Sequence, residues 1–208
     1  YITIAGGHRI GITGTAVIKE DKVSFIKDIS GLNYRLAGEV IGAADEVVPM
    51  ILKGGGIKNT LIISPPGAGK TTMLRDIVRQ LSYKSYRVSV VDERSEIAAL
   101  CEGRSAFDLG FSTDVLEGVD KAEGMLMVLR SMSPDVIVTD EIGKQSDIDA
   151  IERITNSGAA VIATIHGRNI DMIKRRDDLK RMLKFFDLII TLSKRKGIGT
   201  VEEALTEW

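Results

Sequence analysis

The sequence is poor in cysteine and histidine, has almost no net charge and contains no long apolar run. Its single cysteine, Cys101, cannot form an internal disulfide, which indicates a reducing compartment such as the cytoplasm. With only His8 and His166 beside that cysteine, a zinc site cannot be assembled. The net charge of -1 gives no global basic field, so a nucleic-acid partner is not indicated. The longest apolar runs, 159–165 and 188–192, are strand-sized, far short of the ~20 residues that span a bilayer.

What is present is the composition of a folded domain. Of the 208 residues, 44% are hydrophobic and 27% are charged, which suits one compact domain with a small appendage. The chain begins at Tyr1, without Met and inside a β-like pattern, so we interpret it as a segment of a longer protein. We predict the end of a truncated β-containing domain at 1–36, a linker with a short helix at 37–58, and the main domain at 59–208.

The first 58 residues differ in pattern from the rest. Two β-rich runs, 10–17 and 23–29, flank the polar turn 19–22, which is typical of a hairpin. A short helix is predicted over 46–52, and the glycines at 54–56 form a flexible joint.

From residue 59 onward, strand and helix patterns alternate. This alternation predicts a mainly parallel sheet wound by helices, and open sheets of this kind bind ligands at the carboxyl ends of their strands. The predicted strands are 61–63, 88–91, 136–138, 159–165, 188–192 and 200–204, and the predicted helices are 70–81, 121–132, 147–156 and 170–183.

The most informative motif follows the first of these strands. Residues 60–72 read T-L-I-I-S-P-P-G-A-G-K-T-T, a strand, a tight loop and a helix start, which is the arrangement of a P-loop. Its backbone N–H groups surround phosphate oxygens, Lys70 reaches the β- and γ-phosphates, and the Thr71 hydroxyl binds Mg²⁺. The predicted nucleotide-binding residues are Ser64, Pro65, Pro66, Gly67, Ala68, Gly69, Lys70, Thr71 and Thr72. The fold class is therefore α/β, a RecA-like P-loop NTPase with a partial β-rich N-terminal domain.

One position departs from the P-loop pattern. Ser64 replaces the first glycine, which is acceptable if its φ stays negative, while the close-approach glycines Gly67 and Gly69 are present. The alternative is a chance Gly-Lys-Thr at a helix start, which the flanking strand and helix disfavour. Because no Asn-Lys-x-Asp motif for guanine is present, ATP is favoured over GTP.

The strand 136–138 leads into two carboxylates. A strand of this kind next to the P-loop holds Mg²⁺ through its first acid and orients water through its second. We therefore assign Asp140 to Mg²⁺, through water, and Glu141 to the attacking water. The alternative is a solvated acidic turn after a core strand.

The strand 88–91 also ends in acids. Glu93 is a rival for the general base, and Asp92 is a second group near the metal. Salt bridges within 92–96 are an equally weighted alternative.

A third strand ends at Thr164 and His166, and either side chain can sense the γ-phosphate; a structural histidine is the alternative. Phosphoryl transfer also needs an arginine, from this chain or a neighbouring subunit. The candidates are Arg35, Arg94, Arg104 and Arg130. The basic face of 174–184 is either solvated or contacts an acidic partner or an anionic membrane surface.

Together these motifs resemble those of secretion-type ATPases of the type II and type IV superfamily. Such proteins carry a P-loop, an acidic box, an Asp/Glu-ended strand preceded by Leu-Arg and Pro-Asp, and a Thr-x-His box, to which 64–72, 91–97, 129–141 and 164–166 are similar. More closely, V-D-E-R-S-E-I at 91–97, K-A-E-G-M at 121–125 and L-R-S-M-S-P-D-V-I at 129–137 resemble the stage III sporulation AA family of endospore-forming bacteria.

The resemblance implies a motor ATPase of the mother-cell cytoplasm. It would act with membrane proteins of a sporulation channel complex and contact the membrane peripherally. It also implies a homo-hexamer with ATP and Mg²⁺ at subunit interfaces, and it ranks Arg130 and Arg35 first among the arginines. Hydrolysis would move the N-terminal domain about the joint at 54–56. Secretion ATPases have Gly where this chain has Asp140, which leaves the base open between Glu141 and Glu93.

Two other functions remain as alternatives. A nucleotide-gated assembly protein would bind ATP as a switch with little turnover. A RecA-like nucleic-acid-dependent ATPase would contact phosphates through the basic helix 170–183, with steep salt dependence, but the near-neutral charge disfavours it.

Overall fold

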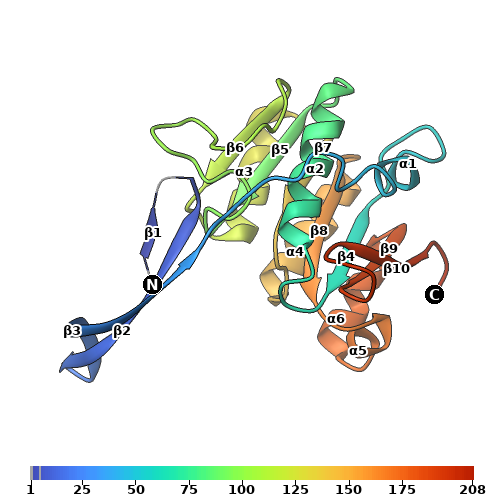
Figure 1. Cartoon of the computed structure of the whole chain (residues 1–208). Helices are drawn as coiled ribbons and strands as arrows, with labels where there is room; N and C mark the ends of the chain where they lie inside the picture. Colours follow the sequence, from blue (N-terminus) through green and yellow to red (C-terminus); the bar gives the residue numbers. More distant parts are fainter. Residues whose placement is uncertain (1, 5) are drawn as a thin grey trace.

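A computed structural model of the chain describes residues 2–4 and 6–208, and most of these residues form one α/β body. Its strands are β4 (Thr60–Ser64), β5 (Val88–Asp92), β6 (Thr113–Glu117), β7 (Val136–Thr139), β8 (Ala160–His166), β9 (Leu188–Ser193) and β10 (Thr200–Leu205). They form a 7-stranded sheet in the order β10-β9-β4-β8-β7-β5-β6 (Figure 1). All neighbours are parallel except β10, which runs antiparallel to β9. The predicted α/β fold class with a mainly parallel sheet is confirmed.

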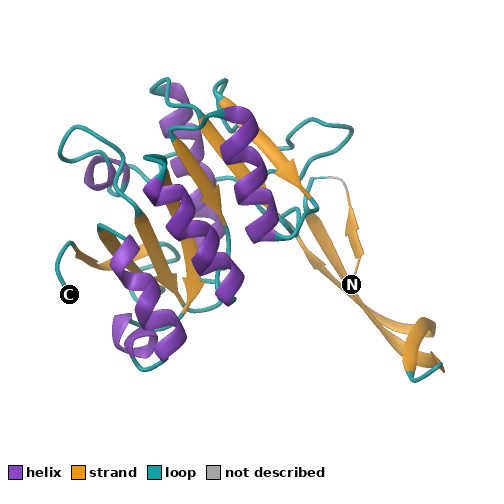
Figure 2. Ribbon diagram, turned by 180° about the vertical axis from the view of Figure 1, so that it is seen from behind, coloured by secondary structure: helices purple, strands orange, loops and turns teal. Residues whose placement is uncertain are grey.

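Helices cover both faces of this sheet. They are α1 (Val48–Ile51), α2 (Lys70–Tyr83), α3 (Lys121–Met132), α4 (Gln145–Asn156), α5 (Ile170–Lys174), α6 (Asp177–Met182) and the 3-10 helix η1 (Leu183–Phe185). Successive strand residues point to opposite faces. Thus Ile62 packs in one core with α1 and α2, while Leu61 and Ile63 pack in the other with α3 to α6. Figure 2 shows the helices of the second face in front of the sheet.

The predicted helix 170–183 is broken into α5, α6 and η1. Ile173 and Leu179 are both buried, and their separation of six positions corresponds to about 1.7 helical turns. One continuous helix would therefore aim these side chains in different directions. The extended backbone of Arg176 restores a common inward direction, with φ -103° and ψ 112°. Strand β6 was not predicted, and its two faces are only partly buried at the edge of the sheet.

The N-terminal residues form a separate antiparallel sheet of β1 (Ile2–Ile4), β2 (His8–Lys19) and β3 (Lys22–Arg35). Glu20 and Asp21 form the two-residue turn between β2 and β3, with φ of 50° and 58°, as tight hairpins require. The β2–β3 ribbon extends away from the α/β body (Figures 1 and 2). The predicted hairpin is therefore present, with both strands longer than expected.

Most of the predicted linker 37–58 packs into the body. The Asp76 carboxylate of α2 accepts a hydrogen bond of 2.8 Å from the Ala44 backbone N–H, and Val47 and Ile51 are fully buried beside α2. The glycines 54–56 form an exposed turn that joins α1 to β4 inside this one body. The glycines 54–56 therefore do not connect the N-terminal sheet to the body, since α1 before them already packs on the body.

Candidate functional site

The loop between β4 and α2 has the backbone that the phosphate-binding motif requires. Gly67 and Gly69 have φ of 70° and 89°, in the left-handed region that favours glycine. Gly69 is the N-cap of α2, so the first N–H groups of the helix face this loop. Ser64 is fully buried, keeps a negative φ as expected, and donates its hydroxyl to the Pro65 carbonyl at 3.1 Å.

The P-loop lysine lies in a cluster of side chains from neighbouring strand ends. Parallel pairing sets His166 level with Ser64, and the Lys70 Nζ lies 3.5 Å from the His166 Nε2. His166 Nε2 also contacts the Glu141 Oε1, while the Arg94 Nη1 lies 3.6 Å from the other Glu141 oxygen. The structure thus brings together the predicted lysine, sensor histidine and base, and adds one candidate arginine.

Strand β7 does not lie beside the P-loop strand. Strand β8 separates β4 from β7, so the predicted adjacency is wrong. The acids of β7 reach the site because His166, at the end of β8, extends between Glu141 and Lys70. Parallel strands place their carboxyl ends at one sheet edge, so contact across an intervening strand needs only one long side chain.

Glu141 has an unusual backbone that Thr164 holds in place. Its φ of 32° lies in the left-handed region, where a residue with a side chain is strained. The Glu141 N–H donates to the Thr164 hydroxyl at 2.9 Å, and the Ile142 N–H donates to the Thr164 carbonyl at 2.9 Å. Thr164 is fully buried, so its hydroxyl positions Glu141 rather than facing a phosphate.

A buried lysine that the sequence analysis missed holds the other acids. The Lys121 Nζ lies 3.0 Å from the Asp140 Oδ1 and 3.2 Å from the Glu93 Oε2, and both Lys121 and Asp140 are buried. Burial would lower the pKa of Lys121, but the Asp140 and Glu93 carboxylates hold it above its usual value. Burial also raises the pKa of Asp140, against the pull of Lys121. A lysine in a first helical turn, where a cation is disfavoured, was the available signal.

The two rival bases therefore have different surroundings. Glu141 contacts His166, which lies next to Lys70, whereas Glu93 pairs with Lys121 and is 4.0 Å from Lys144. This arrangement favours Glu141 as the group nearest the P-loop lysine.

Asp92 is a loop-stabilising residue rather than a group near the metal. Its fully buried carboxylate accepts hydrogen bonds of 2.8 Å from the backbone N–H groups of Glu96, Ile97 and Ala98. The alternative of salt bridges within 92–96 does not hold in this form, because the ion pairs of these residues are with distant residues, such as Glu96 with Arg9.

A cleft of about 150 Å³ separates the P-loop helix from the N-terminal segment. Thr71 and Thr72 line it from α2, and Arg35 and Arg9 line it from the N-terminal sheet. Arg35, predicted to contact nucleotide, is thus placed beside the first turn of α2. Arg130 is exposed at the far end of α3, nine residues after Lys121 and so about 13 Å along the helix axis. It lies outside this cluster. Arg104 lies in the β5–β6 connection.

Arg75 of α2 joins the parts around this cleft and was not predicted. Its guanidinium donates to the carbonyls of Ile97 and Glu96 at 2.8 Å each, and to the Gly38 carbonyl. The ring of Phe107 lies 3.7 Å from its Cζ, a stacked cation–π contact. Nothing in the pattern of α2 distinguishes this buried arginine from an exposed one.

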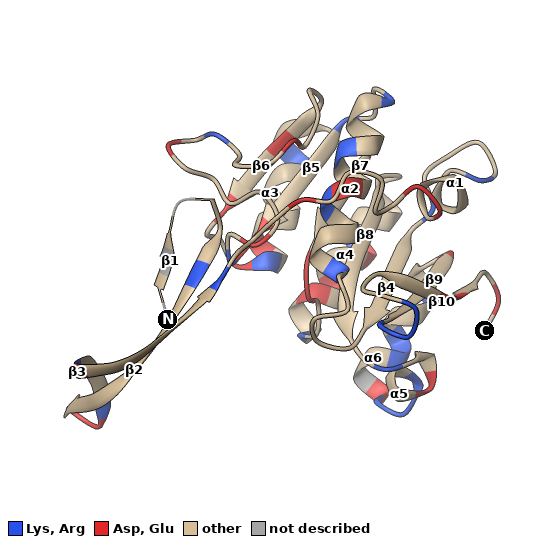
Figure 3. Cartoon of the chain, viewed as in Figure 1, with Lys and Arg blue, Asp and Glu red and all other residues tan. Residues whose placement is uncertain are grey.

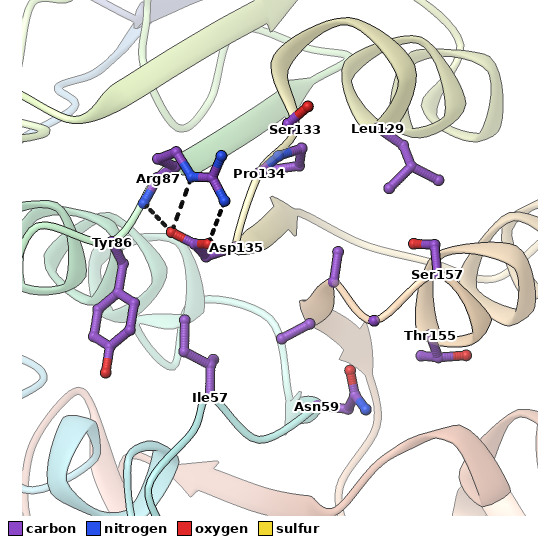
Figure 4. A pocket seen from close by; sticks show the side chains of 13 residues that line it. Ile57, Asn59, Tyr86, Arg87, Leu129, Ser133, Pro134, Asp135, Thr155 and Ser157 are labelled. Atoms are coloured by element: carbon purple, nitrogen blue, oxygen red, sulfur yellow. Dashed lines mark hydrogen bonds and ion pairs between the residues drawn. The ribbon is translucent and has the colours of Figure 1, made fainter.

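A larger cavity, of about 620 Å³, lies at the opposite end of the sheet (Figure 4). Asn59, Arg87 and Asp135 precede β4, β5 and β7 there, so this cavity is at the amino ends of the strands. Its main charges are paired with each other, since the Arg87 Nη2 lies 2.7 Å from the Asp135 Oδ1. The cavity is therefore separate from the phosphate loop.

Among the residues that the structure describes, no helix has the length and apolarity needed to cross a bilayer, and no three His, Cys, Asp or Glu side chains are grouped to hold a metal. Mg²⁺ in nucleotide sites often uses only one or two protein oxygens together with phosphates and water, which Thr71 and Asp140 suit. Figure 3 shows basic residues gathered on α5 and α6.

Solved structures that are similar to this one include ATPases. The Legionella pneumophila ATPase DotB matches with a TM-score of 0.61 at 19% identity, covering 88% of this chain and 53% of DotB. The pilus retraction motor PilT with bound ADP has a TM-score of 0.58 at 18% identity, covering 90% of this chain and 58% of PilT. The Brucella suis VirB11 ATPase, in complex with sulphate, has a TM-score of 0.55 at 15% identity, covering 77% of this chain and 50% of VirB11. These likenesses confirm the fold.

Sequence relatives identify the family. Stage III sporulation protein AA of Bacillus subtilis (strain 168) is 40% identical over 210 residues, covering 98% of this chain and 68% of that protein. Protein SEEDLING PLASTID DEVELOPMENT 1 of Arabidopsis thaliana is 30% identical over 159 residues, covering 74% of this chain and 22% of that protein. The family model "Sporulation stage III, protein AA" matches residues 1–207. The chain spans about half the length of the solved ATPases and belongs to the family of sporulation stage III protein AA.

Proposed function

We propose that this chain is an ATP-hydrolysing domain that binds the nucleotide phosphates at Ser64–Thr72. One observation carries the proposal. The P-loop Lys70 and the carboxylate Glu141 meet through His166 at the carboxyl ends of β4, β7 and β8. Phosphoryl transfer needs a cation at the terminal phosphates and a group that orients water, and this cluster supplies both.

Each side chain has a distinct role in this proposal. Lys70 neutralises charge on the β- and γ-phosphates, and Glu141 orients the attacking water and accepts its proton. His166 lies between them, 3.5 Å from the Lys70 Nζ, so its position depends on what Lys70 contacts. It can therefore report loss of the γ-phosphate to Glu141. Arg94, at 3.6 Å from Glu141, adds positive charge beside the base.

The residues present fit Mg²⁺. Positive-φ glycines leave the loop open to phosphates, and the Asp140 Oδ1, which is ion-paired with the Lys121 Nζ at 3.0 Å, accepts no hydrogen bond of good geometry. The Thr71 hydroxyl would bind the ion directly, and Asp140 would bind it through water. When bound, Mg²⁺ neutralises phosphate charge and fixes phosphate geometry. The adjacent carboxylates of Asp140 and Glu141 make this edge of the sheet attractive to a cation.

Family membership supports a role in sporulation, as the name of the Bacillus subtilis relative states. We extend this to a motor in a sporulation channel complex, acting in the mother-cell cytoplasm with membrane partners and peripheral membrane contact. We also propose a homo-hexamer, because Arg130 lies away from the P-loop of its own chain and would need a neighbouring copy to reach one. Arg35 would contact nucleotide from the N-terminal side of the cleft.

Steady-state ATP turnover with Mg²⁺ tests the function. Lys70→Ala should abolish turnover, while Lys84→Ala, at the other end of the same helix, should leave it unchanged. Glu141→Gln should lower kcat by about 10²- to 10⁴-fold, the usual contribution of a general base, and Glu93→Gln should lower it far less. Turnover that survives Lys70→Ala contradicts the function, and the reverse order of the two glutamates contradicts the choice of base. Measuring the size of the protein in solution, with and without ATP–Mg²⁺, tests the proposed hexamer.

A nucleotide-gated switch is the second candidate. It is favoured by one observation, namely that both strand-end acids are already engaged, Asp140 by Lys121 and Glu141 by His166 and Arg94. A switch would release no more than one product per bound nucleotide, with or without membrane partners, whereas a motor would turn over repeatedly.

A further inference from the structure

The turn between β9 and β10, residues 194–199, lies directly on the P-loop. The Gly199 N–H donates to the Ala68 carbonyl at 3.0 Å. A Cβ on Gly69 would lie 2.8 Å from the Ile198 Cγ2, and a Cβ on Gly67 would lie 2.9 Å from the Lys194 Nζ. Glycine at 69 is therefore needed for contact with this turn as well as for its φ of 89°, whereas Gly67 is needed for its φ of 70° and only faces the flexible end of Lys194.

Strand pairing explains why the turn lies there. Strand β9 runs parallel beside β4, with Thr191 opposite Ile63. The chain that leaves β9 consequently runs level with the chain that leaves β4, and Lys194 stands beside the start of the P-loop. The turn is fixed from within, because the Arg195 Nε donates to Glu202 at 2.9 Å and the Thr200 hydroxyl donates to the Gly197 carbonyl at 2.7 Å.

Lys194 differs from the next residue in its charge pairing. Arg195 is bound to Glu202, whereas the side chain of Lys194 is exposed and its ammonium has no hydrogen bond or ion pair among the residues that the structure describes. Its ammonium lies against Gly67, in the middle of a loop built to bind anions. Lys70 lies at the start of α2 and Lys194 directly follows β9, so the two lysines come to this loop from different elements.

We propose that Lys194 is a second phosphate-binding lysine, which the β9–β10 turn supplies to the P-loop of the same chain. Its ligand is the phosphate chain of the nucleotide, so the inference rests on the proposed function. A lysine contributes here as a point charge with charge-assisted hydrogen bonds to phosphate oxygens. The turn also covers the loop, since Gly199 and Ile198 contact Ala68 and Gly69.

Binding of the nonhydrolysable analogue AMP-PNP with Mg²⁺, measured by calorimetry, tests this role. Lys194→Ala should weaken binding about tenfold or more, the usual effect of losing a hydrogen bond to a charged group. Lys194→Arg should retain most of the affinity, and Lys196→Ala, which removes the same charge from the same turn, should bind like the unaltered protein. Lys194 is exposed, so thermal unfolding of Lys194→Ala should be unchanged.

A second measurement uses the unaltered protein. Amine acetylation followed by mass spectrometry should show that AMP-PNP with Mg²⁺ protects Lys194 several-fold but leaves Lys196 unprotected. If AMP-PNP binds but protects both lysines equally, or if Lys194→Ala binds normally, Lys194 has no phosphate role and the nucleotide function stands. If the unaltered protein and Lys70→Ala both fail to bind, the nucleotide function and this inference fail together.

Discussion

Replacing Lys121 by methionine should destabilise this protein strongly, because it leaves a buried carboxylate without its partner. The Lys121 Nζ lies 3.0 Å from the Asp140 Oδ1, and the relative exposures of the two side chains are 5% and 3%. Methionine keeps the length and the apolar stem of the side chain but removes the ammonium. Any loss of stability then reports mainly the charge rather than the packing.

The expected loss of stability in Lys121→Met follows from the burial of the ion pair. Removing one partner of a buried ion pair costs about 3–5 kcal/mol, since the remaining charge stays desolvated. For a domain of this size each kcal/mol lowers Tm by roughly 2–4 °C, so Lys121→Met should lower Tm by about 6–20 °C. Lys144→Met is the matched control. Lys144 also pairs with an acid, Asp120 at 3.0 Å, but Lys144 is solvent-exposed. The Tm of Lys144→Met should therefore be nearly the same as that of the unaltered protein.

The loss of stability in Lys121→Met should decrease as pH falls. In Lys121→Met the Asp140 carboxyl keeps the burial that raises its pKa and loses the ammonium that lowers it. A folded-state pKa raised above the unfolded value means that the folded state binds more protons, so stability increases as pH falls. The difference in Tm between the variant and the unaltered protein should therefore shrink from pH 8 to pH 5.

The double variant Lys121→Met with Asp140→Asn isolates the pair. Because it leaves no unpaired buried charge, it should recover most of the lost stability, and the two single effects should not add. The assay is thermal unfolding followed by circular dichroism on all four proteins. If Lys121→Met unfolds like the unaltered protein, or if the double variant shows the sum of the single losses, the buried-pair explanation is wrong.

Two further predictions concern packing around α2 and α3. Asp76→Asn should destabilise the attachment of Ala44 to α2. Burial would raise the pKa of Asp76, but its hydrogen bonds hold the pKa below the usual value, so its contribution to stability is present above about pH 4 and is lost as pH falls further. The Tm difference between Asp76→Asn and the unaltered protein should therefore shrink as pH falls below about 4. Gly124→Ala should cost about 1–3 kcal/mol in chemical denaturation, because its Cβ would lie 2.7 Å from the Val91 Cγ1, which outweighs the gain of up to ~1 kcal/mol in helix propensity. Gly56→Ala, with open space at its Cβ, should show no such loss, and equal effects at the two glycines would contradict the contact.

Local patterns predicted most of the α/β body. The helix expected at 121–132 has the observed bounds, and the strands at 61–63, 88–91 and 136–138 lie within β4, β5 and β7. These segments combine strong apolar patterns with clear boundaries, so local propensity and tertiary packing agree. The helix expected at 170–183 was wrong as a single element, because its apolar spacing required a break that only docking against the core imposes.

The candidate site was predictable in composition but not in its pairing. Each predicted strand end supplied a polar group, so Lys70, Glu141 and His166 could be expected near one another. Which carboxylate contacts which cation was not predictable, because the first-turn position of Lys121 indicates that it needs a nearby acid but does not say which one. The Lys194 contact depends on β9 pairing with β4, which no local pattern specifies.

The sequence by itself determined the phosphate loop, the alternation of strands and helices, and the family, since these depend on residue types at short, fixed spacings. Only the tertiary structure decided that β8 lies between β4 and β7, that residues 42–52 belong to the body, and that buried Lys121 pairs with Asp140. The physical reason is the separation in sequence of the residues that interact. Spacing along the chain fixes neighbours within a few residues, whereas strand order and burial bring together side chains that are far apart in sequence, and only there do their charges and hydrogen bonds interact.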